Sequence, residues 1–151
     1  MADATLDIAA QRSRRAEFLR WVVEVSDTEE FLHRSEERAK ALRELKKSQL
    51  RNFEHVAYDA RAVSDVVNFV KSSAGRDRSR TWGAAANDIL DDVNRRLGPS
   101  AKSKAEEELS GESDEMVVAR RAREYHLALI REYAKQIVAH YEFMTRDDGD
   151  R

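Results

Sequence analysis

The chain has 151 residues and a net charge of −2, and 37% of its residues are charged, so overall charge neither favours nor excludes a polyanionic partner. It contains no cysteine, which excludes disulfides and thiolate-bound zinc or iron–sulfur centres. No stretch approaches the ~20 apolar residues of a membrane span, and the first residues lack the apolar run of a signal peptide, so we expect a cytoplasmic protein without a membrane partner.

Helix breakers are rare in this sequence, which contains one proline and five glycines. We therefore expect an all-α protein: a single domain over residues 1–151, folded as a compact bundle of four to five helices. The first helix is predicted over residues 5–24, where the apolar side chains gather in the second half. The second is predicted over residues 27–45, because Ser26 or Asp27 can cap its first turn while Glu29 or Glu30 reaches back.

The third helix is predicted over residues 48–74 as one continuous segment, with Gly75 at its end. Apolar residues recur there at steps of three and four, which is typical of one buried helix face: Leu50, Phe53, Ala57, Ala60, Val63, Val67, Val70 and Ala74. A similar stripe from Trp82 to Leu97 predicts a fourth helix over residues 81–97, which Gly98 and Pro99 should end.

The C-terminal third combines a polar segment with a long helix. Residues 100–114 contain few apolar side chains, so we expect an exposed linker there. A fifth helix is predicted over residues 115–144 from an apolar stripe that begins at Met116 and ends at Met144. The charged tail, residues 145–151, is expected to be disordered.

The segment between the third and fourth predicted helices could bind phosphates. Arg76, Arg78 and Arg80 stand there with a single aspartate, and Lys71 lies about one turn earlier. Guanidinium groups bind phosphates through paired hydrogen bonds, and the start of the next helix adds backbone donors. Trp82 could stack on a base, although its place on the apolar stripe favours packing in the core. The alternative is a solvated loop with local ion pairs.

A second basic surface is predicted on the third helix. Lys47, Arg51 and His55 are spaced by four, so they share one face of that helix, away from its apolar stripe. A third and less ordered basic cluster lies near the N-terminus and consists of Arg12, Arg14, Arg15 and Arg20.

One motif is enzyme-like. The segment from Arg121 to His126, Arg-Ala-Arg-Glu-Tyr-His, resembles the arginine–histidine motif of HEPN-type ribonucleases, which are small helical bundles whose active site is shared across a dimer. The alternative is a solvated Arg121 and a packed His126. No two of the four histidines are spaced three or four apart, so no metal is expected, and no glycine-rich loop follows a strand, so no nucleotide or other cofactor is expected.

Three segments resemble the small helical subunit of type III CRISPR effector complexes. Leu45–Phe53, Leu-Lys-Lys-Ser-Gln-Leu-Arg-Asn-Phe, resembles the opening of a helix in that family. Val67–Arg76 is similar to the continuation of the same helix, and Tyr133–Phe143 is similar to the family's closing helix.

This resemblance implies a non-catalytic subunit, present in several copies, that contacts guide RNA and target RNA through their backbones while base pairing carries the sequence information. The partners it implies are these RNAs, other protein subunits of the effector complex and copies of the chain itself. Two alternatives stay open: the HEPN-like ribonuclease, and a helical adaptor that binds only proteins. The residues on matching positions of the family's motifs are Gln49, Arg51, Lys71 and Arg76. Local charge adds Lys47, Arg78 and Arg80.

Overall fold

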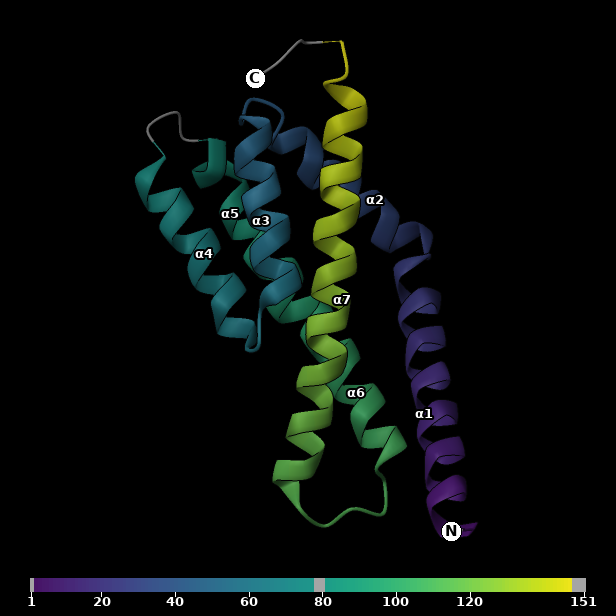
Figure 1. The fold of residues 1–151 in the computed structure, drawn as a ribbon. Coiled ribbons are helices and arrows are strands. Elements are labelled where there is room, and N and C mark those ends of the chain that lie inside the picture. The colour runs from purple at the N-terminus through teal and green to yellow at the C-terminus, as the bar shows by residue number, and fades with distance from the viewer. Residues whose placement is uncertain (1, 78–80, 148–151) are drawn as a thin grey trace.

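The computed structural model describes residues 2–77 and 81–147, with side chains described from residue 7 onward. This part of the chain is all-helical and contains no strand, which confirms the predicted class (Figure 1). Its helical segments are α1 (Ala2–Ser26), α2 (Glu29–Ala41), α3 (Lys47–Asp59), α4 (Val63–Arg76), α5 (Thr81–Asp91), η1 (Asp92–Leu97), α6 (Gly98–Glu108) and α7 (Glu115–Met144). Because α5, η1 and α6 form one continuous helix, the described part of the chain contains six helices, and the prediction of four to five was too low.

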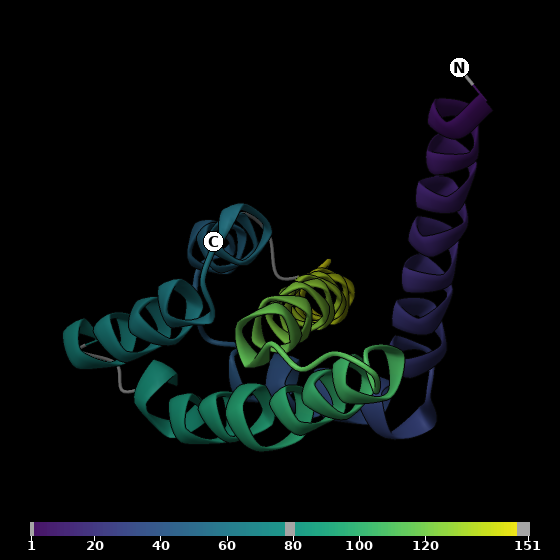
Figure 2. The same ribbon diagram turned by 90° about the horizontal axis from the view of Figure 1, so that it is seen from below.

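The helix α7 is the axis of the bundle, and α2, α3 and α6 pack along it (Figure 1). Seen from below, α3 and α4 lie on one side of α7, the segment from α5 to α6 lies on another, and α1 projects away (Figure 2). The main core contains an aromatic cluster in which the Trp82 ring meets the rings of Phe53 and Phe69 edge to face, at centroid distances of 5.8 and 6.1 Å. None of the described helices is both long and apolar enough to cross a bilayer.

The predicted third helix is in fact two helices. The chain leaves helical geometry at Ala60 and re-enters it at Val63, because the Asp65 carboxylate accepts the backbone N–H groups of Arg61 and Ala62 and so caps α4. The apolar spacing conceals this break, since it continues through the turn. On α4 the fully buried positions are Val66 and Val70, one step away from part of the predicted stripe.

The predicted stop at Gly98 and Pro99 is also wrong. A π-helical segment, η1, directly precedes these residues and joins α5 to α6 without a break. A proline ring clashes with the carbonyl of the fourth residue before it in a regular α-helix, and π-helical turns shift the hydrogen bonds at that place. The segment predicted as an exposed linker, residues 100–114, is therefore helical as far as Glu108 and buries Ala101 and Ala105.

The last predicted helix, residues 115–144, is confirmed by α7. Asp114 caps it, since its carboxylate accepts the N–H of Met116 at 2.9 Å. The predicted tail begins with a turn at residues 145–147, and the rest of the tail lies outside the described residues.

Candidate functional site

The structure places Gln49 and Arg76 at one small pocket. This α3–α4 pocket has a volume of about 240 Å³ and lies where the first turns of α3 meet the last turns of α4. The Oε1 atom of Gln49 accepts the backbone N–H of Lys46 at 2.9 Å, so its amide NH₂ group stays available to a ligand. The residues that line the α3–α4 pocket are Gln49, Asn52, Phe69, Ser73, Arg76, Asp77 and Trp82.

The other predicted RNA-binding residues do not join this pocket. Lys47 and Arg51 turn toward α7, where the Arg51 guanidinium lies 2.9 Å from the Glu142 carboxylate and the Lys47 ammonium lies 4.0 Å from it. Lys71 is exposed on α4 and does not line the pocket. Arg78 and Arg80 lie outside the described residues.

The predicted anion site at the start of the fourth helix is taken by the protein itself. The Asp77 carboxylate accepts the backbone N–H of Trp82 at 2.7 Å, so a protein carboxylate already meets the positive end of α5. The Trp82 side chain is 2% exposed, which confirms that it packs in the core. The alternative prediction, that its ring stacks on a base, is wrong because the ring is not accessible.

Arg121 and His126 are not brought together. Arg121 lines a groove of about 700 Å³ between α1 and α7, which we call the α1–α7 groove. His126 lines a different groove of about 730 Å³, between α6 and α7, together with Gly98 and Ala122. The arginine–histidine motif therefore points its two functional groups to different faces of α7.

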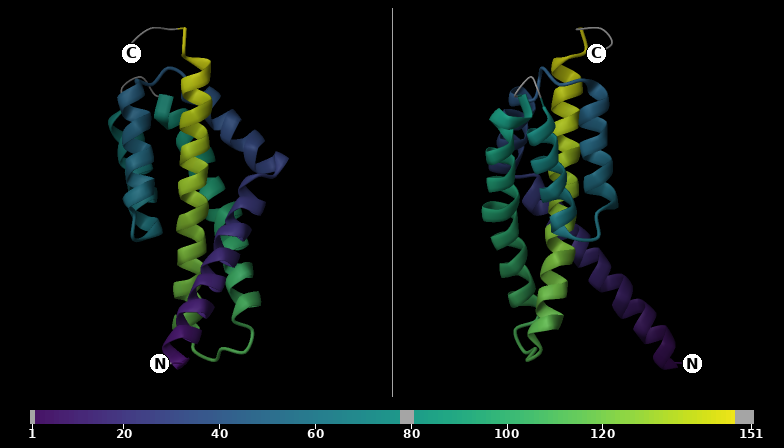
Figure 3. Two further views of the ribbon diagram at one scale, coloured as in Figure 1. Left: turned by 45° about the vertical axis from the view of Figure 1, so that its right-hand side comes forward. Right: turned by 90° about the vertical axis from the view of Figure 1, so that its left-hand side faces the viewer.

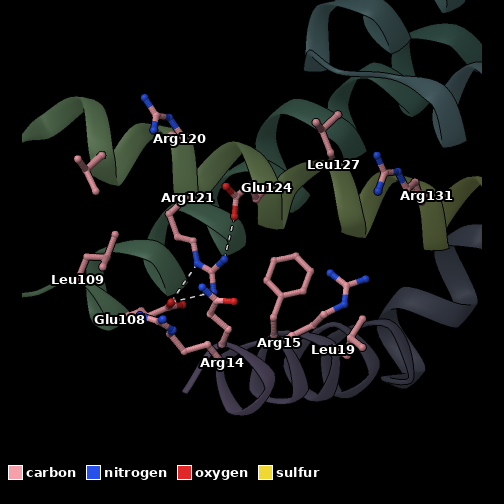
Figure 4. A pocket seen from close by; sticks show the side chains of 13 residues that line it. Arg14, Arg15, Leu19, Glu108, Leu109, Arg120, Arg121, Glu124, Leu127 and Arg131 are labelled. Carbon is pink, nitrogen blue, oxygen red and sulfur yellow. Dashed lines mark hydrogen bonds and ion pairs between the residues drawn. The ribbon is translucent and has the colours of Figure 1, made fainter. Parts of the chain in front are cut away.

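Arg121 ties three helices together. Its guanidinium donates to Glu108 of α6 at 2.9 Å and to Glu124 of α7 at 2.8 Å (Figure 4). It also lies over the rings of Phe18 and Tyr125, at 5.1 and 4.8 Å from their centroids. Burial lowers the pKa of Arg121, but the hydrogen bonds to the two glutamates outweigh burial and raise it above its usual value. The arginine is thus permanently charged and occupied.

The Tyr125 ring completes this junction. It is buried, it stacks on Phe18 at 4.6 Å, and it meets Trp21 edge to face at 4.8 Å, so it holds the second half of α1 against α7. Its hydroxyl donates to Glu108. Burial and this hydrogen bond raise the pKa of Tyr125 to about 12. For Glu108, burial raises the pKa, but the bonds from Tyr125 and Arg121 outweigh it, so the pKa is lowered.

Further arginines line the α1–α7 groove, and sequence reasoning did not assign them a common site. Arg14 and Arg15 come from α1, and Arg120 and Arg131 come from α7 (Figure 4). In the described part of the chain, Arg14, Arg15 and Arg120 make no ion pair. The Arg131 guanidinium lies over the Tyr58 ring, 5.9 Å from its centroid. The sequence feature that could have indicated this common site is a pair of adjacent arginines in both α1 and α7, at residues 14–15 and 120–121.

His126 is half-buried beside the π-helical segment. Its Nε2 atom lies 2.7 Å from the carbonyl oxygen of Val93, to which it must donate because a carbonyl only accepts. Gly98 allows this close approach, since a Cβ at that position would lie 3.2 Å from the imidazole Cε1. Burial lowers the pKa of His126, and the bond to Val93 only partly offsets this effect.

This lowered pKa predicts a loss of stability in weak acid. Between the lowered pKa and the value of ~6.5 in the unfolded chain, the unfolded state binds more protons, so stability falls as pH decreases. We expect the melting temperature of the protein to fall between about pH 7 and pH 5, and His126→Gln to weaken this dependence. A melting series over this range tests it, with the exposed His55→Gln as the control; equal slopes in both variants would contradict it.

Comparison with known proteins identifies no relative: no family model matches the sequence, and no curated protein or solved structure matches it at a significant level.

Proposed function

We propose that the chain is a non-catalytic, RNA-contacting subunit of a larger ribonucleoprotein, of the kind that the resemblance to the small subunit of type III CRISPR effectors implies. The observation that supports this proposal is the α3–α4 pocket. It gathers the guanidinium of Arg76, the amides of Gln49 and Asn52 and the hydroxyl of Ser73 on one small surface. Such donors suit phosphate and ribose oxygens.

The chemistry of the pocket favours binding over cleavage. Among its described lining residues there is no histidine, and its one carboxylate, Asp77, is occupied by the backbone of α5. General acid–base chemistry on RNA needs a group that can exchange protons near neutral pH. The donors of the pocket can instead position a nucleic acid backbone without reading its bases.

The surroundings of the pocket add a modest positive field. Lys47 and Arg51 share one carboxylate, that of Glu142, so their group keeps a net positive charge, and Lys71 is exposed nearby on α4. Exposed charges of this kind attract a polyanion over about 10 Å at moderate salt. We therefore assign them to steering the RNA and the pocket to holding it.

The test is RNA binding by the full-length chain carrying Gln49→Glu and Arg76→Glu together. We expect at least a ~10-fold loss of affinity for a fluorescent single-stranded RNA and a shallower salt dependence, because phosphate contacts disappear. Fluorescence anisotropy at two salt concentrations measures both. Glu at position 49 can still accept the Lys46 N–H, so the start of α3 is preserved.

The matched control reverses one charge away from the pocket. Arg95→Glu changes a side chain that is 83% exposed on η1, and we expect less than a ~2-fold change in RNA affinity. An equal loss in both variants would reduce the effect to overall charge and would overturn the proposal. Purification from the native cell supplies a second readout, since recovery of the chain without short RNAs or large protein subunits would also count against it.

A further inference from the structure

The α1–α7 groove has the length of a short helix. One wall is α1 from Gln11 to Leu19, and the other is α7 from Val117 to Arg131 (Figure 4). The wall on α7 covers 14 residue steps, which correspond to about 21 Å of helix at ~1.5 Å per residue. The two helices diverge toward the N-terminus of α1 (Figure 3). An additional helix of about four turns matches this length.

The charge of the groove is one-sided. Its lining contains five arginines and two glutamates, and both glutamates are already bound by Arg121. Arg14, Arg15 and Arg120 have no acidic partner among the described residues. Three arginines gathered on two helices without counter-charges repel one another, so a negatively charged occupant would lower the electrostatic energy of this surface.

The groove also exposes apolar side chains. Leu19 is 48% exposed and Val117 is 36% exposed, and both line the groove beside the partly buried Phe18. Every described side chain of α1 from Asp7 to Glu17 is exposed, so the first half of this helix has almost no packing of its own. A helix gains most of its stability from packing an amphipathic face, and the first half of α1 lacks that packing.

We propose that the α1–α7 groove binds an amphipathic helix of a partner protein, with an apolar stripe that lies on Leu19, Val117 and Phe18 and acidic residues that face the arginines. Helix-in-groove recognition uses apolar anchors at positions i, i+3 or i+4, and i+7, which suits a floor of this composition. A nucleic acid backbone would satisfy the arginines but would leave Leu19 and Val117 exposed to water. The apolar floor therefore favours a protein.

The test uses a synthetic helical peptide of about four turns with leucines on one face and glutamates on both flanks. We expect it to bind the full-length chain, and to bind at least ~10-fold more weakly to Arg15→Glu with Arg120→Glu and to Leu19→Ser with Val117→Ser. All four residues are exposed or lie at the rim, so the fold should survive, which far-ultraviolet circular dichroism checks. Arg20→Glu is the matched control: it reverses an exposed arginine of α1 that does not line the groove, and affinity should be unchanged.

The outcomes separate a protein partner from RNA. A peptide of the same pattern with lysines in place of glutamates should not bind. If a single-stranded RNA binds instead, and its affinity falls with the arginine variants but not with the Leu19 and Val117 variants, the groove is a nucleic acid site and the proposal is wrong. Failure of the acidic peptide to bind the unmodified chain would also overturn it. Neither result bears on the α3–α4 pocket, which lies elsewhere on the molecule.

Discussion

Replacing Asp92 with alanine should lower the free energy of unfolding by about 3–5 kcal/mol, the cost of breaking a buried ion pair from one side. The Asp92 side chain is 2% exposed on η1, and its Oδ2 atom accepts from Arg38 Nε at 2.7 Å and from the Tyr133 hydroxyl at 2.6 Å. Arg38 belongs to α2 and Tyr133 to α7, so this single carboxylate joins three helices. Without it, the Tyr133 hydroxyl would remain buried and unpaired, and the partly buried Arg38 guanidinium would keep only its longer pair with Asp88, at 3.8 Å.

The pKa directions agree with this role. Burial lowers the pKa of Arg38, but the bond to Asp92 outweighs burial and raises it. Burial and the Asp92 charge raise the pKa of Tyr133 well above its usual value, so its hydroxyl stays a donor. The second oxygen, Oδ1, accepts no hydrogen bond but lies 3.5 Å from Arg96 Nε. The Oδ2 atom of Asp92 therefore accepts two hydrogen bonds, whereas Oδ1 has only a longer ion-pair contact.

Urea denaturation at neutral pH measures the loss. The matched control is Asp91→Ala, which removes the neighbouring carboxylate from a pair with Arg95 at 3.3 Å, and an exposed pair of this kind contributes about 0–1 kcal/mol. Asp92→Asn keeps the shape of the acceptor and should lie between the two. Similar losses for Asp91→Ala and Asp92→Ala would show that the network does not stabilise the fold in this way.

The features that sequence predicts well are those that neighbours along the chain determine. The limits of α7 follow from its long apolar stripe, and the predicted range 115–144 coincides with the observed one. The start of the second helix was also close, although the capping side chain is Thr28, whose hydroxyl accepts the N–H of Phe31 at 3.3 Å. Caps and periodicity are local, so they can be read without tertiary structure.

The two wrong boundaries arise where tertiary contacts override a local signal. At residues 60–62 the stripe continues, so periodicity alone cannot show that Asp65 caps a new helix. At Gly98 and Pro99 the residues favour a stop, but Ala101, Ala105 and Leu109 continue the four-residue spacing from Leu97. Burying Ala101 and Ala105 against Tyr125 gives the extra helix its stability.

The candidate sites were the least predictable part, because the groups that meet at each site come from distant parts of the sequence. The partner of Lys47 and Arg51 is Glu142, which is 91 residues away from Arg51. The α1–α7 groove joins arginines that lie about a hundred residues apart, and the packing of α1 on Tyr125 and Arg121 of α7 brings them together. Among the predicted residues, Gln49 and Arg76 meet at one pocket, and Lys47 and Arg51 meet at the Glu142 carboxylate.

Arg121→Ala should destabilise the protein by about 2–3 kcal/mol and should loosen α1 before the rest of the bundle unfolds. The guanidinium satisfies Glu108 and Glu124 and covers the Phe18 and Tyr125 rings, so its removal leaves a partly buried carboxylate and uncovers the α1 contact. Arg121→Lys keeps the charge but cannot reach two carboxylates with a planar fork, so its effect should be intermediate.

Hydrogen exchange distinguishes this local effect from general destabilisation. In Arg121→Ala, amide exchange over residues 18–25 of α1 should accelerate more than exchange over α3, because the Phe18 and Trp21 contacts with Tyr125 attach this segment to α7. The control is Arg120→Ala, the adjacent arginine with no ion pair among the described residues, whose stability change should stay within about 0.5 kcal/mol. Equal behaviour of the two variants would mean that Arg121 does not hold α1 in place. If only Arg121→Ala releases α1, then the arginine of the ribonuclease-like motif positions one wall of the α1–α7 groove. This result would assign Arg121 a structural role that does not depend on RNA cleavage.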